Sequence, residues 1–156
     1  MIDQRDIQIL ELLQENGRVT ASEISKTVDL SIPAIGERIK KLSERGLIKG
    51  YSTVLDHKVA GLDLTAFVFI VSEHSDHYQK FIDESTSSAS VLECHSIIGT
   101  GSHILKVRAQ NSQALEDILY EIQNWPGVKR TQSNLVLSTY KETSAIDLKV
   151  LAKTID

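Results

Sequence analysis

The sequence contains little of several features that mark specialised classes of protein. Its 156 residues include one cysteine, two prolines and one tryptophan, and aromatic residues make up 5% of the chain. The single Cys94 cannot form an internal disulfide, which agrees with a reducing compartment. The scarcity of aromatic side chains argues against a broad base-stacking surface of the kind that binds single-stranded nucleic acid.

Long apolar runs are missing as well. No run approaches the roughly 18 residues that would span a bilayer, and residues 1–6 lack the basic-then-apolar pattern of a signal peptide. We therefore expect a cytoplasmic protein with no membrane partner. The composition is otherwise that of a globular chain, with 41% apolar and 24% charged residues. Its length gives room for one ordinary domain or two small ones.

Charge is distributed unevenly along the chain. The net charge of −4 argues against a uniformly basic coat for nucleic acid, but residues 38–49 carry five basic side chains against Glu44 alone. Such a run is usually a solvated helix face. It becomes informative through the helix pattern in which it lies.

Two short helices are predicted before residue 30. Asp3 can cap the first, and Gly17 suits the left-handed position just beyond its end. Thr20 and Glu23 form a capping box for a second helix over residues 21–28, because each side chain can satisfy a free backbone amide of the first turn.

A third helix follows after a tight turn. The turn over residues 29–31 ends at Ser31, which can cap the third helix, and Pro33 is tolerated in its first turn. Gly46 ends this helix. Two helices joined by so short a turn indicate a helix-turn-helix, here over about residues 22–41.

The third helix exposes a small, neutral start followed by basic residues. Ile35, Ile39 and Leu42 share one face and point inward. The outer face suits a helix whose first turn approaches base edges of duplex DNA while its flank meets phosphates. An ordinary three-helix bundle with a solvated third helix would show the same pattern. The predicted DNA-binding residues are Ser31, Ile32, Pro33, Ala34, Glu37, Arg38, Lys40 and Lys41.

The remaining hundred residues are predicted to alternate strands and helices in the order β-α-β-β-α-β. The strands are expected over residues 64–72, 91–98, 103–109 and 128–141, and the helices over 77–85 and 113–125. The first strand is apolar almost throughout, so we expect it to be central and covered on both faces. Ser112 is the expected cap of the second helix. The order is that of the ferredoxin-like split unit, which makes the fold class α+β.

Four segments follow from these patterns. Residues 1–50 are a predicted winged helix-turn-helix domain, and residues 51–63 a linker strand and turn. Residues 64–141 are the ferredoxin-like domain. Residues 142–156 are a C-terminal tail, with a helix over residues 145–155.

A helix-turn-helix followed by such a domain resembles the Lrp/AsnC family of transcription regulators, the feast/famine regulators. The most specific block runs from Leu30-Ser31 to Leu42 and continues through Gly46 to Gly50-Tyr51. The match extends into the second half at Glu93-Cys94-His95, the Gly99-containing hairpin and Pro126-Gly127-Val128. One departure is Asp29, which stands where the family usually has glycine; aspartate tolerates the left-handed conformation better than most residues.

The resemblance implies a DNA-binding regulator whose second domain senses small molecules. In that family the N-terminal domain binds duplex DNA, and the C-terminal domain pairs subunits and responds to an amino acid or a related metabolite. Homodimers through the C-terminal sheets, assembling further to octamers, are therefore expected, and two-fold symmetry implies an approximately palindromic operator.

The predicted effector loop is where the resemblance weakens. Relatives commonly read Gly-x-x-Asp, whereas this chain reads Gly-Thr-Gly-Ser, so that a hydroxyl replaces the carboxylate that would face a ligand ammonium. The loss of one charged hydrogen bond weakens binding by about ten- to a hundredfold. We therefore expect standard amino acids to bind weakly, and any effector to be chemically different or absent. The candidate effector-binding residues are Gly99, Thr100, Gly101, Ser102, His103, Thr131 and Ser133.

Alternative roles remain for some of these residues. Glu37 can accept a hydrogen bond from cytosine or pair with Lys41 along the helix. Arg38 can contact phosphate or lock the third helix onto its neighbour. Thr131 and Ser133 can simply pair across the sheet.

Enzymatic chemistry and metal binding are not expected. Cys94 and His95 are adjacent on a predicted strand, so their side chains point to opposite faces and cannot act together as nucleophile and base. No histidines are spaced as metal ligands on one helix, and no cofactor is predicted. The second functional hypothesis is a metabolite-binding or assembly protein whose helix-turn-helix serves protein contacts.

Overall fold

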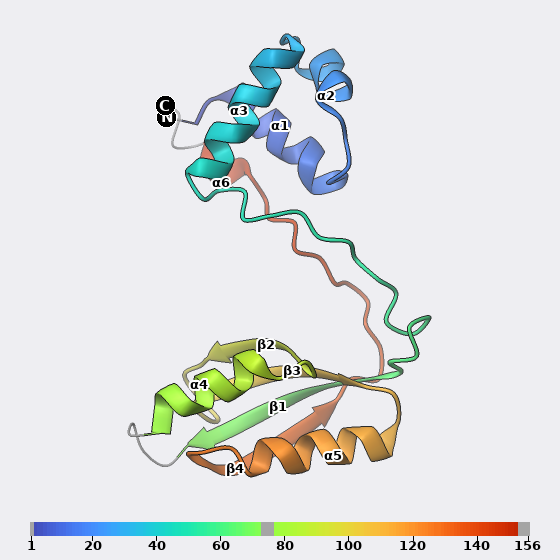
Figure 1. The fold of residues 1–156 in the computed structure, drawn as a ribbon, viewed down its shortest axis with the longest axis vertical. Coiled ribbons are helices and arrows are strands. Elements are labelled where there is room, and N and C mark those ends of the chain that lie inside the picture. Colours follow the sequence, from blue (N-terminus) through green and yellow to red (C-terminus); the bar gives the residue numbers. More distant parts are fainter. Residues whose placement is uncertain (1, 73–76, 153–156) are drawn as a thin grey trace. The chain divides into compact units, whose positions relative to one another are not determined.

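The computed structural model describes residues 2–72 and 77–152, and the chain divides into two compact units (Figure 1). The helical unit consists of residues 1–54 together with residues 141–156, and the sheet unit consists of residues 55–140. The predicted tail is thus grouped with the helix-turn-helix, because both ends of the chain contribute to one unit.

Three helices open the helical unit: α1, Gln4–Glu15; α2, Ala21–Val28; and α3, Ile32–Glu44. Each begins at the cap that the sequence predicts. The side chains of Asp3, Thr20 and Ser31 accept a hydrogen bond from the third backbone amide of their helix. The capping box of Thr20 and Glu23 is formed, and α1 has a reciprocal box made by Asp3 and Asp6.

The helix ends follow the sequence less closely than the starts. Gly46 ends α3 as predicted, with a left-handed φ of 74° and a backbone hydrogen bond of 2.9 Å that closes the last turn. Asp29 carries the turn after α2 at φ 52°, which confirms that it takes the left-handed conformation. The prediction for Gly17 is wrong. Asn16 leaves the helix in an extended conformation, and its side chain accepts an amide two residues on, so no left-handed residue is needed.

Two apolar clusters hold the helical unit together. The first lies among all three helices and contains Ile9, Ile24, Val28 and Ile35. The second joins α1 and α3 to the C-terminal tail through Ile7, Leu10, Leu42 and Leu148. Because Leu148 is 5% exposed, the tail contributes a core residue to this unit.

The tail helix begins later than expected. Within the described residues of the tail, the helix is α6, Lys149–Ala152. The side chain of Gln14 on α1 donates to the Ile146 carbonyl at 3.1 Å and accepts from the Ile146 N–H at 2.8 Å. The backbone of residue 146 is therefore paired with α1 and cannot continue a helix. The predicted helix also included Ile155, which lies outside the described residues.

The sheet unit is a four-stranded antiparallel sheet in the order β2-β3-β1-β4. The strands are β1, Leu64–Ser72; β2, Val91–Ser96; β3, His103–Ala109; and β4, Val128–Leu135. The connecting helices are α4, Tyr78–Ser87, and α5, Ser112–Gln123. The predicted α+β class and ferredoxin-like order are confirmed. None of the helices in the described residues is long and apolar enough to cross a membrane.

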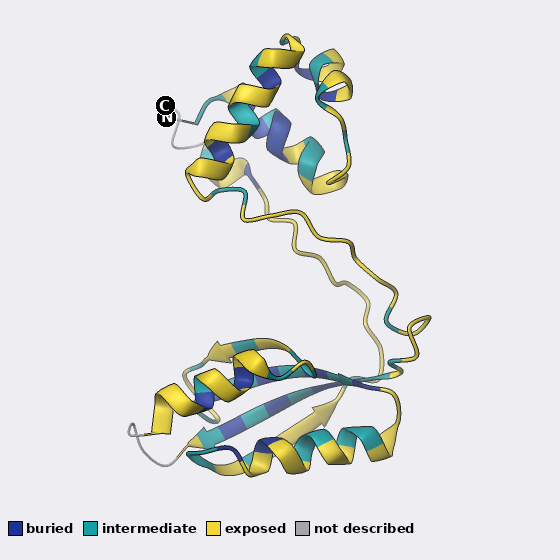
Figure 2. Ribbon diagram, in the orientation of Figure 1, coloured by how far each residue is buried: buried dark blue, intermediate teal, exposed yellow. Residues whose placement is uncertain are grey.

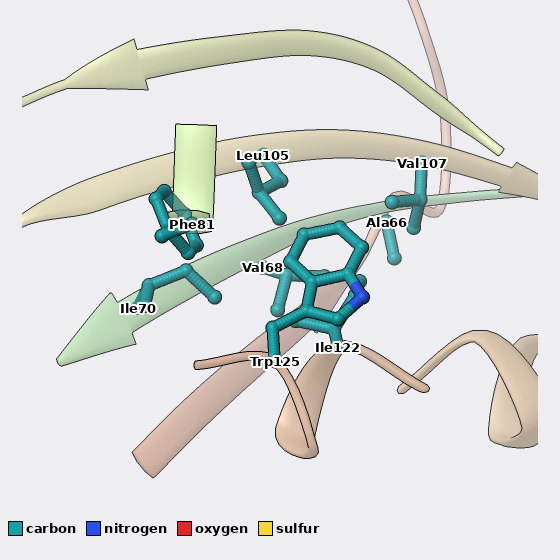
Figure 3. Close-up of a cluster of buried hydrophobic side chains, with 8 residues drawn as sticks. All are labelled: Ala66, Val68, Ile70, Phe81, Leu105, Val107, Ile122 and Trp125. Atoms are coloured by element: carbon teal, nitrogen blue, oxygen red, sulfur yellow. The ribbon is translucent and has the colours of Figure 1, made fainter. Parts of the chain in front are cut away.

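The core of the sheet unit lies between one face of the sheet and the two helices. Figure 3 shows its side chains, which are Ala66, Val68, Ile70, Phe81, Leu105, Val107, Ile122 and Trp125. Buried and less buried residues alternate along β1 (Figure 2), and Phe67 and Phe69 occupy the other face, where they stay partly exposed. Among the described residues of the sheet unit, the helices α4 and α5 cover one face of β1, and the predicted cover of its second face is not found within this unit.

Several predicted boundaries differ from the structure. β2 ends at Ser96 rather than residue 98, because its pairing with β3 stops at His103. α4 covers Tyr78–Ser87 rather than 77–85, and α5 covers Ser112–Gln123 rather than 113–125. β4 ends at Leu135 rather than residue 141, because its neighbour β1 begins at Leu64 and no strand lies beside the later residues. α5 is capped by Asn111, whose side chain accepts an amide at 2.9 Å, one residue before the expected Ser112. The predicted linker strand is wrong, since residues 51–63 contain only a turn.

Candidate DNA interface and effector loop

α3 presents the surface that the sequence assigns to DNA. Ser31 caps the helix through a 3.4 Å hydrogen bond from the Ala34 amide. The first turn carries the small residues Pro33 and Ala34 beside the half-exposed Ile32, and its positive dipole end favours an approaching anion. Of the predicted contact residues, Ala34 and Arg38 are partly exposed, and the exposed ones are Ser31, Ile32, Pro33, Glu37, Lys40 and Lys41.

The lysines of this surface are paired along the helix. Lys41 Nζ lies 3.3 Å from a Glu37 carboxylate oxygen, and Lys40 Nζ lies 3.8 Å from one of Glu44. All four side chains are more than half exposed, and exposed pairs of this spacing contribute only about 0.3–0.5 kcal/mol. A phosphate can therefore replace either glutamate at little cost. The predicted helix pair of Glu37 is confirmed, and its contact with cytosine stays a prediction.

Arg38 differs from the lysines because its partners come from another helix. Its Nη1 lies 2.7 Å from a carboxylate oxygen of Asp3 and 2.7 Å from one of Asp6. The Arg38 side chain is 29% exposed and that of Asp6 is 9% exposed. Of the two roles that the sequence leaves open, this geometry favours the lock onto the neighbouring helix.

The two aspartates divide their oxygens between two tasks. One oxygen of each completes the capping box of α1, at 2.9 and 3.0 Å, and the other accepts from Arg38. Partial desolvation alone would raise the pKa of Asp3, but the hydrogen bonds from the Asp6 amide and Arg38 outweigh it and hold that pKa below its usual value. The hydrogen bonds from Arg38 to the carboxylates of Asp6 and Asp3 raise the pKa of Arg38. Asp3 and Arg38 therefore stay ionised across the neutral range.

The predicted effector loop is a tight turn between β2 and β3. Gly99 and Gly101 have φ angles of 133° and 123°, which disfavour any other residue. A side chain at Gly101 would also place its Cβ 2.6 Å from the Ile70 carbonyl oxygen. The loop is therefore pressed against the end of β1 through Gly101, whereas Gly99 has open space around it.

Ser102 is held by three neighbours. Its backbone N–H donates to the Ile70 carbonyl at 2.7 Å, and its hydroxyl donates to the same oxygen at 3.2 Å. The Ser72 hydroxyl donates to Ser102 Oγ at 2.9 Å, and His103 Nδ1 lies 3.0 Å from it. The Ser102 hydroxyl is therefore already engaged by residues of β1 and β3.

His103 belongs to the core and not to the solvent-facing surface. It is 3% exposed and its ring lies 4.6 Å from that of Phe81 and 5.4 Å from that of Tyr78, measured between centroids. Burial lowers its pKa, so the neutral form is favoured. The cavity beside it, lined also by Gly127, has a volume of about 10 Å³, room for one water molecule at most.

The other two candidate effector residues lie apart from the loop. Thr131 and His103 both pair with Ile70, but from opposite sides of β1. The Thr131 hydroxyl donates to the Gln123 side chain of α5 at 2.9 Å, and Ser133 is exposed opposite Val68. The structure therefore gathers residues 99–103 into one site and leaves Thr131 and Ser133 outside it.

Several residues of these sites were not predicted. Ser72 has no distinguishing signal, since it is one polar residue at the end of a strand. Asp3 and Asp6 carry a weak one, because they are two acids at a helix start and Arg38 lies on the shoulder of α3 between buried positions. Within the described residues, no three His, Cys, Asp or Glu side chains are grouped to hold a metal ion.

Comparison with known proteins agrees with both halves of this description. Residues 2–49 match the winged helix-turn-helix DNA-binding family, and residues 65–146 match the Lrp/AsnC ligand binding domain. The HTH-type transcriptional regulator FL11 of Pyrococcus horikoshii is 32% identical over 148 residues, which are 95% of this chain and 97% of that protein.

Solved structures of two regulators resemble the whole chain. A transcriptional regulator from Neisseria meningitidis in complex with L-methionine has a TM-score of 0.92 at 30% identity, over 97% of this chain and 99% of its own. The feast or famine regulatory protein of M. tuberculosis, also complexed with L-methionine, has a TM-score of 0.84 at 30% identity, over 94% and 99%. The chain belongs to the Lrp/AsnC family of transcriptional regulators.

Proposed function

We propose that α3 enters the major groove of duplex DNA and reads an approximately palindromic operator. The observation that carries this proposal is the first turn of α3, where the small residues Pro33 and Ala34 leave the helix start open. Behind it stand Lys40 and Lys41, whose exposed pairs with glutamates can be exchanged for phosphates. A helix with this order of residues places base contacts at its start and phosphate contacts along its flank.

Selection from a random pool of duplexes tests this docking. Bound duplexes should converge on a palindrome whose half-sites lie one helical turn or a multiple apart, in steps of about 34–36 Å. A pool that stays random after repeated rounds would contradict the proposal. It would favour the second candidate, an assembly protein whose helix-turn-helix contacts protein.

A palindrome requires paired chains, and the face of the sheet opposite α4 and α5 is the surface that we propose for this pairing. Phe67, Phe69 and Val71 of β1 and Ile104 of β3 are only partly buried on the face of the sheet opposite α4 and α5. Single exposed apolar residues are normal on a monomer, whereas several neighbouring ones on one face mark an interaction surface. We infer that the chain is at least a homodimer, with octamers as the further assembly. Light scattering at micromolar concentration should return a multiple of the 17.3 kDa chain mass; a monomer mass would contradict the inference.

The effector proposal starts from the loop over residues 99–103. Its glycines let backbone amides approach a ligand carboxylate, but Ser102 offers the ammonium no charge and has its hydroxyl engaged by Ser72 and His103. The two regulators bound to L-methionine are relatives, and we propose that this chain binds standard amino acids more weakly or responds to a different small metabolite. Calorimetry across the twenty amino acids should give no micromolar dissociation constant; one such value would contradict this.

Two further inferences complete the proposal. The relatives named above are regulators, and Cys94 and His95 alternate along β2, so we infer that the chain performs no catalysis of its own and needs no cofactor. We place its action in the cytoplasm, where a protein with one cysteine and a duplex target would work.

A further inference from the structure

The Asp3–Asp6–Arg38 cluster connects the start of α1 to the middle of α3. Arg38 lies one turn after Ala34 and one turn before Lys41 on the same flank of α3. The contacts that fix Arg38 therefore also fix this flank of α3. The flank carries Ala34, which is predicted to face the bases, and Lys41, which is predicted to contact phosphate. The partners of Arg38 are 32 and 35 residues away in sequence.

The cluster is built so that the capping box and the arginine contact depend on each other. Each carboxylate uses one oxygen for the box and the other for Nη1 of Arg38, and the Asp6 side chain is 9% exposed. Release of Arg38 would leave Asp6 as an unpaired, largely buried charge, which is costly. A phosphate cannot simply take over the arginine, in contrast to Lys40 and Lys41.

We propose that Arg38 is a positioning residue for DNA recognition: anchored by Asp3 and Asp6, it sets the angle at which α3 meets the groove and does not itself bind phosphate. This inference rests on the proposed docking of α3. The charged residues that line the groove beside the cluster are four acids, Asp3, Asp6, Glu37 and Glu44, and three cations, Arg38, Lys41 and Arg45, so the groove offers a phosphate no excess of positive charge. The same groove contains Ala34, so the orientation of the first turn depends on the anchor.

The test compares Arg38→Gln with Lys41→Gln, which removes one positive charge from the same flank. Fluorescence anisotropy is recorded with the full chain, on the selected operator and on a scrambled duplex, over a range of salt concentrations. Lys41→Gln should weaken both duplexes alike and flatten the slope of log K against log salt by about one unit. Arg38→Gln should leave the salt slope and the affinity for the scrambled duplex unchanged. It should lower the affinity for the operator about tenfold, which is the equivalent of roughly one base contact.

Asp6→Asn, alone and combined with Arg38→Gln, also distinguishes a phosphate ligand from a positioning residue, because the two roles predict opposite changes in DNA affinity. Asp6→Asn removes a negative charge near the DNA, so it should strengthen binding to both duplexes if Arg38 is a phosphate ligand. If Arg38 is a positioning residue, Asp6→Asn should weaken the operator alone, and adding Arg38→Gln should cause little further loss. Asp3→Asn retains a good helix cap and serves if Asp6→Asn fails to fold.

The outcomes separate this inference from the proposed function. If the unmodified chain prefers its operator and Arg38→Gln flattens the salt slope like Lys41→Gln, Arg38 binds phosphate and this inference alone is overturned. If the unmodified chain shows no preference between the two duplexes, the proposed docking is overturned and this inference with it. Melting temperatures measured alongside ensure that each affinity belongs to folded protein.

Discussion

The two candidate sites differ in how their polar groups are satisfied. On α3, Lys40 and Lys41 have only exposed partners one turn away. In the loop between β2 and β3, the Ser102 hydroxyl has Ser72, His103 and the Ile70 carbonyl around it. One surface can exchange its partners for a ligand, and the other must first break internal hydrogen bonds.

This difference makes the two surfaces unequal as binding sites. The exchangeable pairs on α3 suit a surface that meets a polyanion. The loop retains the glycine conformations of a ligand-binding turn, at Gly99 and Gly101, without a free charge to hold an ammonium. We therefore predict that this chain binds its operator strongly and responds only weakly to standard amino acids.

The largest effect should come from blocking the open start of α3. Ala34→Glu places a carboxylate against base edges and phosphates, and like charges so placed cost several kcal/mol, so operator affinity should fall about a hundredfold or more. Circular dichroism should remain that of the unmodified protein, since Ala34 is not in the buried clusters. Ser43→Glu places a carboxylate at an exposed position near the other end of α3 and is the control. It should lower operator affinity far less. Normal gel shifts with Ala34→Glu would refute the docking.

A carboxylate added to the loop should raise its affinity for an amino acid and so reduce the difference between the loop and α3. Ser102→Asp supplies an acceptor for an ammonium, and one charged hydrogen bond corresponds to an affinity gain of about ten- to a hundredfold. Titration calorimetry with L-methionine measures the gain. Ser102→Ala removes the hydroxyl without adding charge and should bind no better than the unmodified chain. Equal affinities for all three proteins would show that residue 102 does not limit binding.

The two loop glycines should respond unequally to a side chain. Gly101→Ala brings a methyl group to 2.6 Å from the Ile70 carbonyl oxygen in addition to its positive φ, whereas Gly99→Ala has only the φ cost. Backbone strain of this kind costs about 1–3 kcal/mol, and we expect Gly101→Ala to lose more of the free energy of unfolding than Gly99→Ala. Urea denaturation gives both values. The reverse order would mean that the loop is not pressed against β1.

Acid should produce the smallest effect and should act on the sheet unit first. Burial lowers the pKa of His103 from its ordinary 6.5, so the unfolded chain takes up the proton at a higher pH than the folded one. The stability of the sheet unit should be full above about pH 6.5 and decline as pH falls below it. The pKa of Asp3 is also lowered, so its contribution is lost only at more acidic pH. His103→Gln should flatten the decline between pH 6.5 and 5; an unchanged decline would assign it to other groups.

Local signals in the sequence predicted the helix starts and the central strands. Caps at Thr20 and Ser31 act within one turn, and the β1 and β3 bounds follow from apolar runs bounded by turn residues. The resemblance supplied the family and the expected roles of α3 and the hairpin.

What the sequence did not predict depends on partners far along the chain. The lock on Arg38 was one of two alternatives, and its partners Asp3 and Asp6 decide in its favour, whereas the late start of the tail helix depends on Gln14. β4 stops where its neighbour begins, although its own sequence continues to favour a strand. The internal partners of Ser102 likewise become visible only when β1 and β3 lie side by side.

The salt dependence of operator binding is the sharpest test of whether α3 reads DNA. If α3 exchanges its lysine–glutamate pairs for phosphates, log K should fall linearly with log salt at a slope of about −0.9 for each phosphate contacted. The operator should remain at least about a thousandfold preferred over a scrambled duplex at physiological salt. A slope near zero, or equal affinity for the two duplexes, would contradict the assignment of α3 as the DNA-reading helix.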